Sequence, residues 1–161
     1  MAHMAATLDT LSEGRLDLGI GAGWYEPEYR VNGYEWRDSF SRLMRLDESI
    51  RVMKEMWTTQ NPHFDGDYYT IEGARCTPRP IQDPHPPVLV GGSGEQITLK
   101  LVAKLADAWN AHVYDSDVST LKQKISIIEQ YCEDIERDSG EIEYSYAAYI
   151  ICTRDDEKLE G

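Results

Sequence analysis

The chain has 161 residues, of which 41% are apolar, so it has the length of one ordinary domain and enough apolar side chains to form a core. Its 16 basic and 29 acidic residues give a formal net charge of −13, which opposes binding to nucleic acid or to an anionic membrane, and we expect neither partner. No apolar run reaches the roughly 20 residues of a membrane span, and no signal-peptide pattern follows Met1, so we expect a cytoplasmic protein.

The first part of the chain predicts a helix followed by a strand. Residues 2–12 form the helix, and Gly14 is its natural stop. Residues 15–21 form the strand, which ends in the glycine-rich segment 21–25. The alternating glycines resemble a dinucleotide-binding fingerprint, but Trp24 stands where a further glycine is needed, so this signal is weak. The pattern still favours a strand end at which a ligand can approach the backbone.

A turn-rich aromatic loop is expected at residues 27–36, and a long helix at residues 40–57 with Asp38 as its N-cap. One stripe of this helix is apolar and predicts a buried face: Leu43, Leu46, Ile50, Met53 and Trp57. The opposite stripe has mixed charge and predicts a solvated face: Arg42, Arg45, Glu48, Arg51 and Glu55. Residues 61–87 then form a long connection, with a turn and an exposed strand at 64–71. Connections of this length often serve as lids or binding loops.

A buried strand at residues 87–90 runs into the turn Gly91-Gly92-Ser93-Gly94. Ser93 and Gln96 have the spacing of a capping box, which predicts that a helix begins here. The first amides of a helix lack internal partners and bind anions, and glycine leaves room for a phosphate. The alternative is a tight connection without a ligand. The buried stripe of this helix is Ile97, Leu101, Val102 and Leu105.

The last third predicts a strand at 107–113, a helix capped by Ser116 that closes near Gly140, and a strand at 142–152. The apolar stripe of that helix is Val118, Leu121, Ile125, Ile128, Cys132 and Ile135. The chain has three cysteines, an odd number, and they lack the paired spacing of a zinc site. We expect Cys76, Cys132 and Cys152 to be reduced and structural, and we expect no metal.

Strands that alternate with helices indicate a parallel sheet, either a doubly wound sheet or a β/α barrel. A barrel needs eight strands and roughly 250 residues. Because four such strands are predicted, the barrel interpretation makes residues 1–161 a single domain that is half of a barrel, truncated at both ends.

Many segments of the chain resemble the bacterial luciferase-like monooxygenase family, in the order and spacing of that family. They are residues 8–24, Glu28-Tyr29, Gly33, Arg45, Glu48, Trp57, residues 64–66, 78–82, 87–92 and 106–110. The resemblance runs from residue 2 to about residue 155. The segment Gly92-Ser93-Gly94-Glu95 is most similar to the branch that uses the deazaflavin coenzyme F420.

The resemblance implies an α/β fold that is part of a (β/α)8 TIM barrel, about strands four to seven with their helices. Members of the family use FMN or coenzyme F420 to transfer a hydride or to activate oxygen on a small organic substrate. The cofactor carries that chemistry, so we assign no catalytic side chain.

The resemblance also implies a set of cofactor-binding residues. Gly91, Gly92, Ser93 and Gly94 match the loop for the cofactor phosphate, in agreement with the independent argument from backbone amides. Gly21, Gly23 and Tyr25 match the loop beside the flavin ring, although many members have asparagine in place of Tyr25. Asn110 is expected at the same face.

Five further side chains follow the predicted strands. Glu26 and Glu28 could donate protons, bind the ring edge or remain solvated, and His112 could act as a base or be structural. Trp24 and Trp109 could wall a planar ring or simply pack in the mouth of the barrel.

Two functions remain open from the sequence. The first is an F420- or FMN-dependent oxidoreductase with a small-molecule substrate. The second is a non-catalytic half barrel that associates with a second copy, because an open sheet leaves unpaired edges and an uncovered apolar face. In both cases we expect a homo-oligomer.

Overall fold

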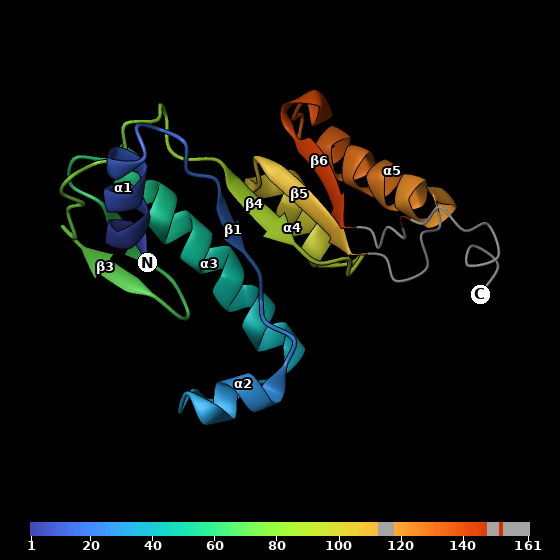
Figure 1. Cartoon of the computed structure of the whole chain (residues 1–161), viewed down its shortest axis with the longest axis horizontal. Coiled ribbons are helices and arrows are strands. Elements are labelled where there is room, and N and C mark those ends of the chain that lie inside the picture. Colours follow the sequence, from blue (N-terminus) through green and yellow to red (C-terminus); the bar gives the residue numbers. More distant parts are fainter. Residues whose placement is uncertain (113–117, 148–151, 153–161) are drawn as a thin grey trace.

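The computed structural model describes residues 1–112, 118–147 and 152 (Figure 1). The elements in chain order are α1 (Ala2–Leu11), β1 (Leu18–Ile20), α2 (Glu26–Val31), α3 (Ser39–Thr58), β2 (His63–Asp65), β3 (Thr70–Glu72), β4 (Val88–Gly91), α4 (Thr98–Leu105), β5 (Ala108–His112), α5 (Val118–Asp134), a 3-10 turn (Ser139–Glu141) and β6 (Glu143–Ala147). In this part of the chain no helix is long and apolar enough to cross a membrane.

The main sheet contains β1, β4, β5 and β6 in that spatial order, and every neighbouring pair is parallel. Each new strand is therefore added on the same side as the one before it. A doubly wound sheet reverses this direction at a switch point, whereas a β/α barrel does not. The strands that the structure describes contain no such reversal, which is the winding of a barrel segment.

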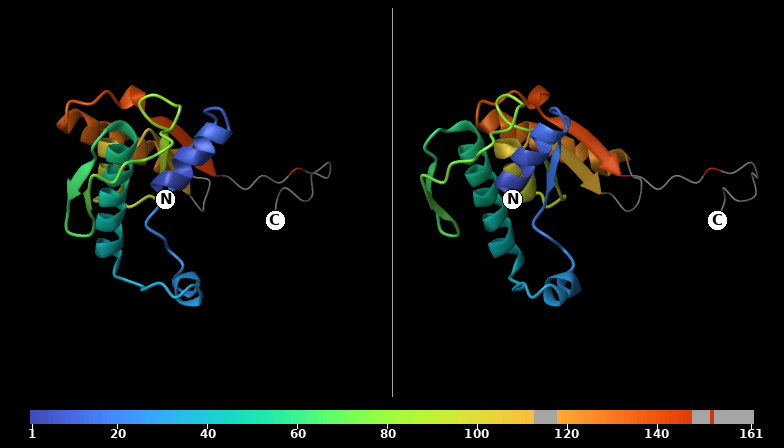
Figure 2. Two further views of the ribbon diagram at one scale, coloured as in Figure 1. Left: turned by 90° about the vertical axis from the view of Figure 1, so that its left-hand side faces the viewer. Right: turned by 60° about the vertical axis from the view of Figure 1, so that its left-hand side comes forward.

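The helices α3, α4 and α5 lie on one face of this sheet (Figures 1 and 2). Alternate strand residues point to that face and are fully buried: Val88, Val90, Trp109 and Ala111. They pack in one apolar core with residues of the covering helices, including Leu99, Val102, Ile128 and Cys132. The opposite face carries Gly19, Leu89, Asn110 and Ser145, none of which is fully buried. The sheet is therefore closed on its helical side and open on the other.

The helix α3 begins as the sequence predicts. The Asp38 carboxylate accepts a hydrogen bond from the Ser41 amide at 2.9 Å, and this is the expected N-cap. Four residues of the predicted apolar stripe are buried: Leu46, Ile50, Met53 and Trp57. Leu43, the fifth, is only half-buried. The indole N–H of Trp57 also donates to the carbonyl of Ala2 at 3.1 Å, which joins α1 to α3.

The prediction of a solvated charged face on α3 is wrong at Glu48. Its carboxylate accepts hydrogen bonds from the amides of Asp67, Tyr68 and Tyr69 at 2.8, 2.8 and 2.9 Å. These residues form the turn between β2 and β3, an antiparallel hairpin. A Cβ at Gly66 would lie 2.5 Å from Oε2 of Glu48, so only glycine allows this approach. Helical periodicity could not reveal that a later segment returns to this face.

Other predicted boundaries also change. The strand expected at 15–21 contains only Leu18–Ile20, and the loop expected at 27–36 includes the short helix α2. α5 ends at Asp134 rather than near Gly140, and Val118 and Ile135 are exposed rather than part of its buried stripe. The expected cap Ser116 and residues 148–151 of the last strand lie outside the described residues.

The capping box predicted from Ser93 and Gln96 is wrong. α4 begins at Thr98, its N-cap is Ile97, and no side chain caps it. Residues 95–97 instead form a turn before the helix, in which the Leu99 amide reaches back to the carbonyl of Gly94 at 3.0 Å. The spacing of a capping box is local, and this extra turn separates it from the helix.

The cysteines Cys76 and Cys132 are buried free thiols, and Cys152 is an exposed free thiol. Burial raises the pKa of Cys76 and of Cys132, which keeps both thiols protonated and unreactive at neutral pH. Their position supports the structural role expected from the sequence. Among the described residues, no three side chains of the metal-binding types form a cluster.

Asp9 fixes the long connection before β4. Its side chain is 0% exposed and accepts hydrogen bonds from the amides of Ile81 and Gln82 at 2.8 and 3.1 Å and from Nε2 of Gln82 at 2.7 Å. Burial favours the neutral acid, but the hydrogen bonds from Gln82 and Ile81 outweigh burial and hold the pKa of Asp9 below its ordinary value of 3.8. The ionised carboxylate therefore stabilises the fold.

We predict that Asp9→Asn lowers the free energy of unfolding at pH 7 by about 2–3 kcal/mol, because charge-assisted bonds to buried amides are lost. The folded pKa is depressed, so this stabilisation is complete above the unfolded pKa and disappears as the pH falls through the folded pKa. Urea unfolding at pH 7 and at pH 3 should therefore show a smaller difference at pH 3. Asp17→Asn, at an exposed position, is the control. Equal losses in the two variants would contradict the role of Asp9.

Candidate functional site

The candidate site lies where the parallel strands end. The register pairs Gly91 with Asn110 and Asn110 with Ser145, and a Cβ at Gly21 would lie 3.6 Å from the carbonyl oxygen of Gly91. Four residues from four strands or strand ends, Gly21, Gly91, Asn110 and Ser145, therefore form a row at the carboxyl edge of the sheet. Asn110 Nδ2 donates to Ser145 Oγ at 2.9 Å, and Ser145 Oγ donates to the carbonyl of Trp109 at 3.2 Å, so both side chains are held in place.

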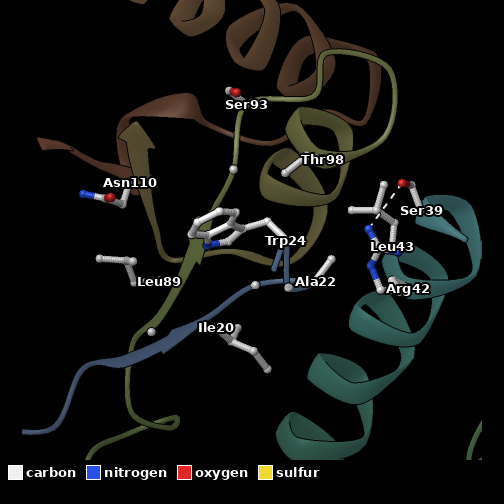
Figure 3. Close-up of a pocket in the computed structure, with 15 residues that line it drawn as sticks. Ile20, Ala22, Trp24, Ser39, Arg42, Leu43, Leu89, Ser93, Thr98 and Asn110 are labelled. Atoms are coloured by element: carbon white, nitrogen blue, oxygen red, sulfur yellow. Dashed lines mark hydrogen bonds between the residues drawn. The ribbon is translucent and has the colours of Figure 1, made fainter. Parts of the chain in front are cut away.

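A pocket of about 750 Å³ opens at this row. Its wall contains Gly19, Ile20, Gly21, Ala22, Gly23, Trp24, Ser39, Arg42, Leu43, Leu89, Gly91, Gly92, Ser93, Thr98 and Asn110. Figure 3 shows the indole of Trp24 between the Asn110 side and the α3 side chains Ser39, Arg42 and Leu43. Most of the predicted cofactor residues are brought together here: Gly21, Gly23, Gly91, Gly92, Ser93 and Asn110.

Two predicted residues do not line this pocket. Tyr25 is 50% exposed and stands at the N-cap of α2, with its ring 5.3 Å from that of Trp24. Gly94 is exposed and is not one of the residues of the pocket wall, and a Cβ there would be 3.0 Å from Thr98 Oγ1. A Cβ at Gly92 would likewise be 3.1 Å from Thr98 Cγ2. These two glycines let the loop pack against α4, whereas a Cβ at Gly91 would meet no atom within 4 Å.

Trp109 does not wall a ring. It is fully buried on the helical side, where its Nε1–H donates to the carbonyl of Gly92 at 2.7 Å. Trp24, in contrast, is 81% exposed and belongs to the pocket wall. The strand register decides between these two tryptophans, because position 109 faces the helices and position 110 faces the open side.

The acidic candidates lie away from the pocket. Glu26 forms an ion pair with Arg30 at 2.6 Å on α2, and Glu28 is exposed on the same helix. The solvated alternative is therefore the better description of both carboxylates. His112 ends β5, but its side chain lies outside the described part of the structure.

The sequence did not indicate several residues of the site. Ser39, Arg42 and Leu43 come from the first turns of α3, and Arg42 was expected to be solvated. Its guanidinium instead lies 3.7 Å from the centre of the Trp36 ring. These residues could not be predicted because the sequence does not show that the start of α3 lies beside the edge of the sheet. Ser145 could have been found from the alternation of β6 once the register was known.

Comparison with known proteins identifies relatives for nearly the whole chain. The family model described as luciferase-like monooxygenase matches residues 1–160. The F420-dependent glucose-6-phosphate dehydrogenase of Amycolatopsis mediterranei is 33% identical over 153 residues, which cover 91% of this chain and 45% of that protein. The FMNH2-dependent dimethylsulfone monooxygenase of Pseudomonas putida is 37% identical over 92 residues, which cover 57% of this chain and 25% of that protein.

Two solved structures show the same fold. An F420-dependent secondary alcohol dehydrogenase, in complex with an F420–acetone adduct, superposes with a TM-score of 0.77 and 28% identity over 90% of this chain and 43% of that chain. The coenzyme F420 dependent tetrahydromethanopterin reductase of Methanopyrus kandleri gives a TM-score of 0.82 at 21% identity, over 98% of this chain and 47% of that chain. The chain thus spans less than half the length of these relatives. The prediction of part of a β/α barrel is confirmed, while its numbering as strands four to seven stays a prediction.

The loop between β1 and α2 yields a test of the pocket wall. Gly23 has a φ of +77°, and a Cβ there would lie 2.2 Å from the hydroxyl of Tyr29, which donates to the carbonyl of Ala22. Gly33 has a similar φ of +73°, but a Cβ there would meet no atom within 4 Å. Alanine at either position would suffer similar backbone strain, because both φ values are positive. Only at Gly23 would the added Cβ also clash with Tyr29.

We predict that Gly23→Ala lowers the free energy of unfolding by about 1–2 kcal/mol more than Gly33→Ala does, because only Gly23→Ala displaces Tyr29. Urea unfolding of the two variants, compared with the wild type, measures the difference. Equal destabilisation would show that the Tyr29 contact does not hold this wall.

Proposed function

This chain belongs to the luciferase-like monooxygenase family, and from that premise we propose that it is a flavin- or deazaflavin-dependent oxidoreductase acting on a small organic molecule. The observation that supports this most strongly is the pocket at the carboxyl edge of the sheet, where the enzymes of β/α barrels carry their active sites. The proposed cofactor is coenzyme F420, or alternatively FMN. Relatives of both kinds match the chain.

The residues present fit such a cofactor. The floor of the pocket at Gly19 and Gly91 is bare backbone, since a Cβ at either position would meet no atom within 4 Å, so a planar ring can lie against it. The exposed indole of Trp24 offers an aromatic surface on the same pocket. Asn110 presents a side-chain amide to the ring edge, and the amides of the loop 91–94 suit a phosphate.

A flavin or deazaflavin, when bound, supplies the hydride transfer or the oxygen chemistry. The residues of this chain would hold and orient it. Gly21 and Gly91 would lie against the ring, Asn110 would contact its edge, and Leu43 and Leu89 would supply apolar walls that exclude water. No side chain of the described pocket needs to act as a nucleophile.

We predict that the purified chain binds F420 or FMN with a dissociation constant in the micromolar range, measured by the change in cofactor fluorescence. Gly91→Ala should weaken binding modestly, and Gly91→Leu should weaken it by about tenfold or more, because the larger side chain fills the floor of the pocket. Thermal unfolding should change little in Gly91→Ala, since the added Cβ meets open space, and the same measurement establishes that Gly91→Leu is folded. Unchanged binding in Gly91→Leu would exclude this floor as the ring site.

A second property follows from the open side of the sheet. β1 and β6 are the edge strands of the main sheet in the described structure, and Leu89 on the face without helices is only partly buried. Unpaired parallel edges and an uncovered face favour association. We therefore propose that the isolated chain forms a homo-oligomer through this side. The three free thiols support a proposed location in the reducing cytoplasm.

Light scattering coupled to size-exclusion chromatography should then give a mass above the 18.4 kDa of one chain. Because each copy carries a formal net charge of −13, added salt should screen the repulsion and shift the equilibrium toward the oligomer. A monomer at both low and high salt would contradict self-association. This result would leave the cofactor proposal intact.

A further inference from the structure

The loop Gly92-Ser93-Gly94 has an unusual pattern of carbonyl contacts. The carbonyl of Gly92 accepts from Trp109 Nε1 at 2.7 Å, that of Ser93 accepts from Lys124 Nζ at 3.0 Å, and that of Gly94 accepts from the Leu99 amide at 3.0 Å. These donors come from β5, α5 and α4. Three consecutive carbonyl groups are therefore bonded to three different elements of the protein interior.

Because the peptide bond is planar, the direction of each carbonyl also fixes the direction of the next amide N–H. In a trans peptide the C=O and the following N–H point in opposite directions. When the three carbonyls point to the protein, the amides of Ser93, Gly94 and Glu95 point away from those donors. None of these amides has a hydrogen-bond acceptor among the described residues. Gly92 and Ser93 line the pocket, so the Ser93 amide lies at its rim, and the amides of Gly94 and Glu95 follow directly along the chain.

Lys124 is the charged member of this arrangement. Its side chain is only 14% exposed, although it lies on α5 and far from the loop in sequence. The ammonium group also forms an ion pair with Glu95 at 3.2 Å, and Glu95 is 48% exposed. Lys124 therefore places an ammonium group, paired with Glu95, at the Ser93 carbonyl, on the side of that peptide opposite to the Gly94 amide.

We infer that Lys124 is a positioning residue for phosphate recognition: it holds the Ser93 carbonyl, and thereby turns the Gly94 amide toward an anion, while its charge adds to the attraction. Trp109 does the same for the Ser93 amide through the Gly92 carbonyl. This inference rests on the proposed function, because the phosphate is that of the proposed cofactor. It assigns the phosphate selectivity of the site to residues outside the pocket wall.

The test compares ligands with and without phosphate. The Kd values of FMN and riboflavin, and of coenzyme F420 and its phosphate-free deazaflavin, are measured for the wild type, Lys124→Met, Lys124→Arg and Lys122→Met. Lys122→Met is the matched control: it removes one positive charge from an exposed position of the same helix, away from the contact with the loop. Thermal unfolding of each variant establishes that it is folded.

We expect the wild type to prefer the phosphorylated ligand and Lys124→Met to lose about tenfold of that preference. Lys124→Arg should restore part of it, and Lys122→Met should keep it. If the role of Lys124 were purely structural, Lys124→Met would weaken the binding of the phosphorylated and the phosphate-free ligand equally. An unchanged ratio in folded Lys124→Met would overturn the inference and leave the proposed function standing.

Trp109→Phe provides a second variant, because it keeps an aromatic ring but removes the donor to Gly92. It should also lower the preference for phosphate. Inorganic phosphate, followed by the NMR shifts of the amides of residues 93–95, separates the two proposals. If wild-type amides respond to phosphate, Lys124→Met amides do not, and no flavin binds, the inference stands and the proposed function fails. If neither phosphate nor flavin binds the wild type, both are overturned.

Discussion

All four strands of the main sheet run in the same direction, and the rest of the structure depends on this constraint. A parallel strand cannot follow its neighbour through a tight turn, so each step needs a crossover. In the part of the chain that the structure describes, the crossovers place α3, α4 and α5 on one face, and no helix covers the opposite face (Figures 1 and 2). They also bring every strand end to one edge. The pocket exists because Gly21, Gly91 and Asn110, which are separated in sequence, lie side by side at or near the carboxyl ends of neighbouring strands.

The long connections are held by single carboxylates rather than by regular secondary structure. Asp9 binds the backbone at Ile81 and Gln82, and Glu48 binds the turn between β2 and β3. Each carboxylate satisfies amides that have no strand or helix partner, and a buried amide without an acceptor is costly. The acidic composition therefore has a structural use in addition to its effect on the surface. These contacts explain why Asp9 and Glu48 are not interchangeable with the other acidic residues near them.

The proposed phosphate site would bind an anion in a strongly acidic chain. Backbone amides would supply the attraction, and the carbonyl contacts with Trp109, Lys124 and the start of α4 fix the direction of these amides. The glycines of the loop serve two purposes. Gly92 and Gly94 allow close packing on Thr98, while Gly91 leaves the floor of the pocket bare. Removing either kind of glycine would damage the site in a different way.

The sequence by itself determined the order of the main strands and the longer helices, most of the buried stripe of α3 and the N-cap at Asp38, because these depend on periodicity and on contacts a few residues apart. It did not reveal α2 or the second strand of the hairpin formed by β2 and β3. Of the eight cofactor-binding residues predicted from the glycine patterns and the family resemblance, six line the pocket. Only the tertiary structure decided that Trp109 faces the helices, that Glu48 binds a hairpin and that Lys124 reaches the Ser93 carbonyl. These roles follow from strand register and from the packing of distant segments, and neither quantity is encoded in local spacing.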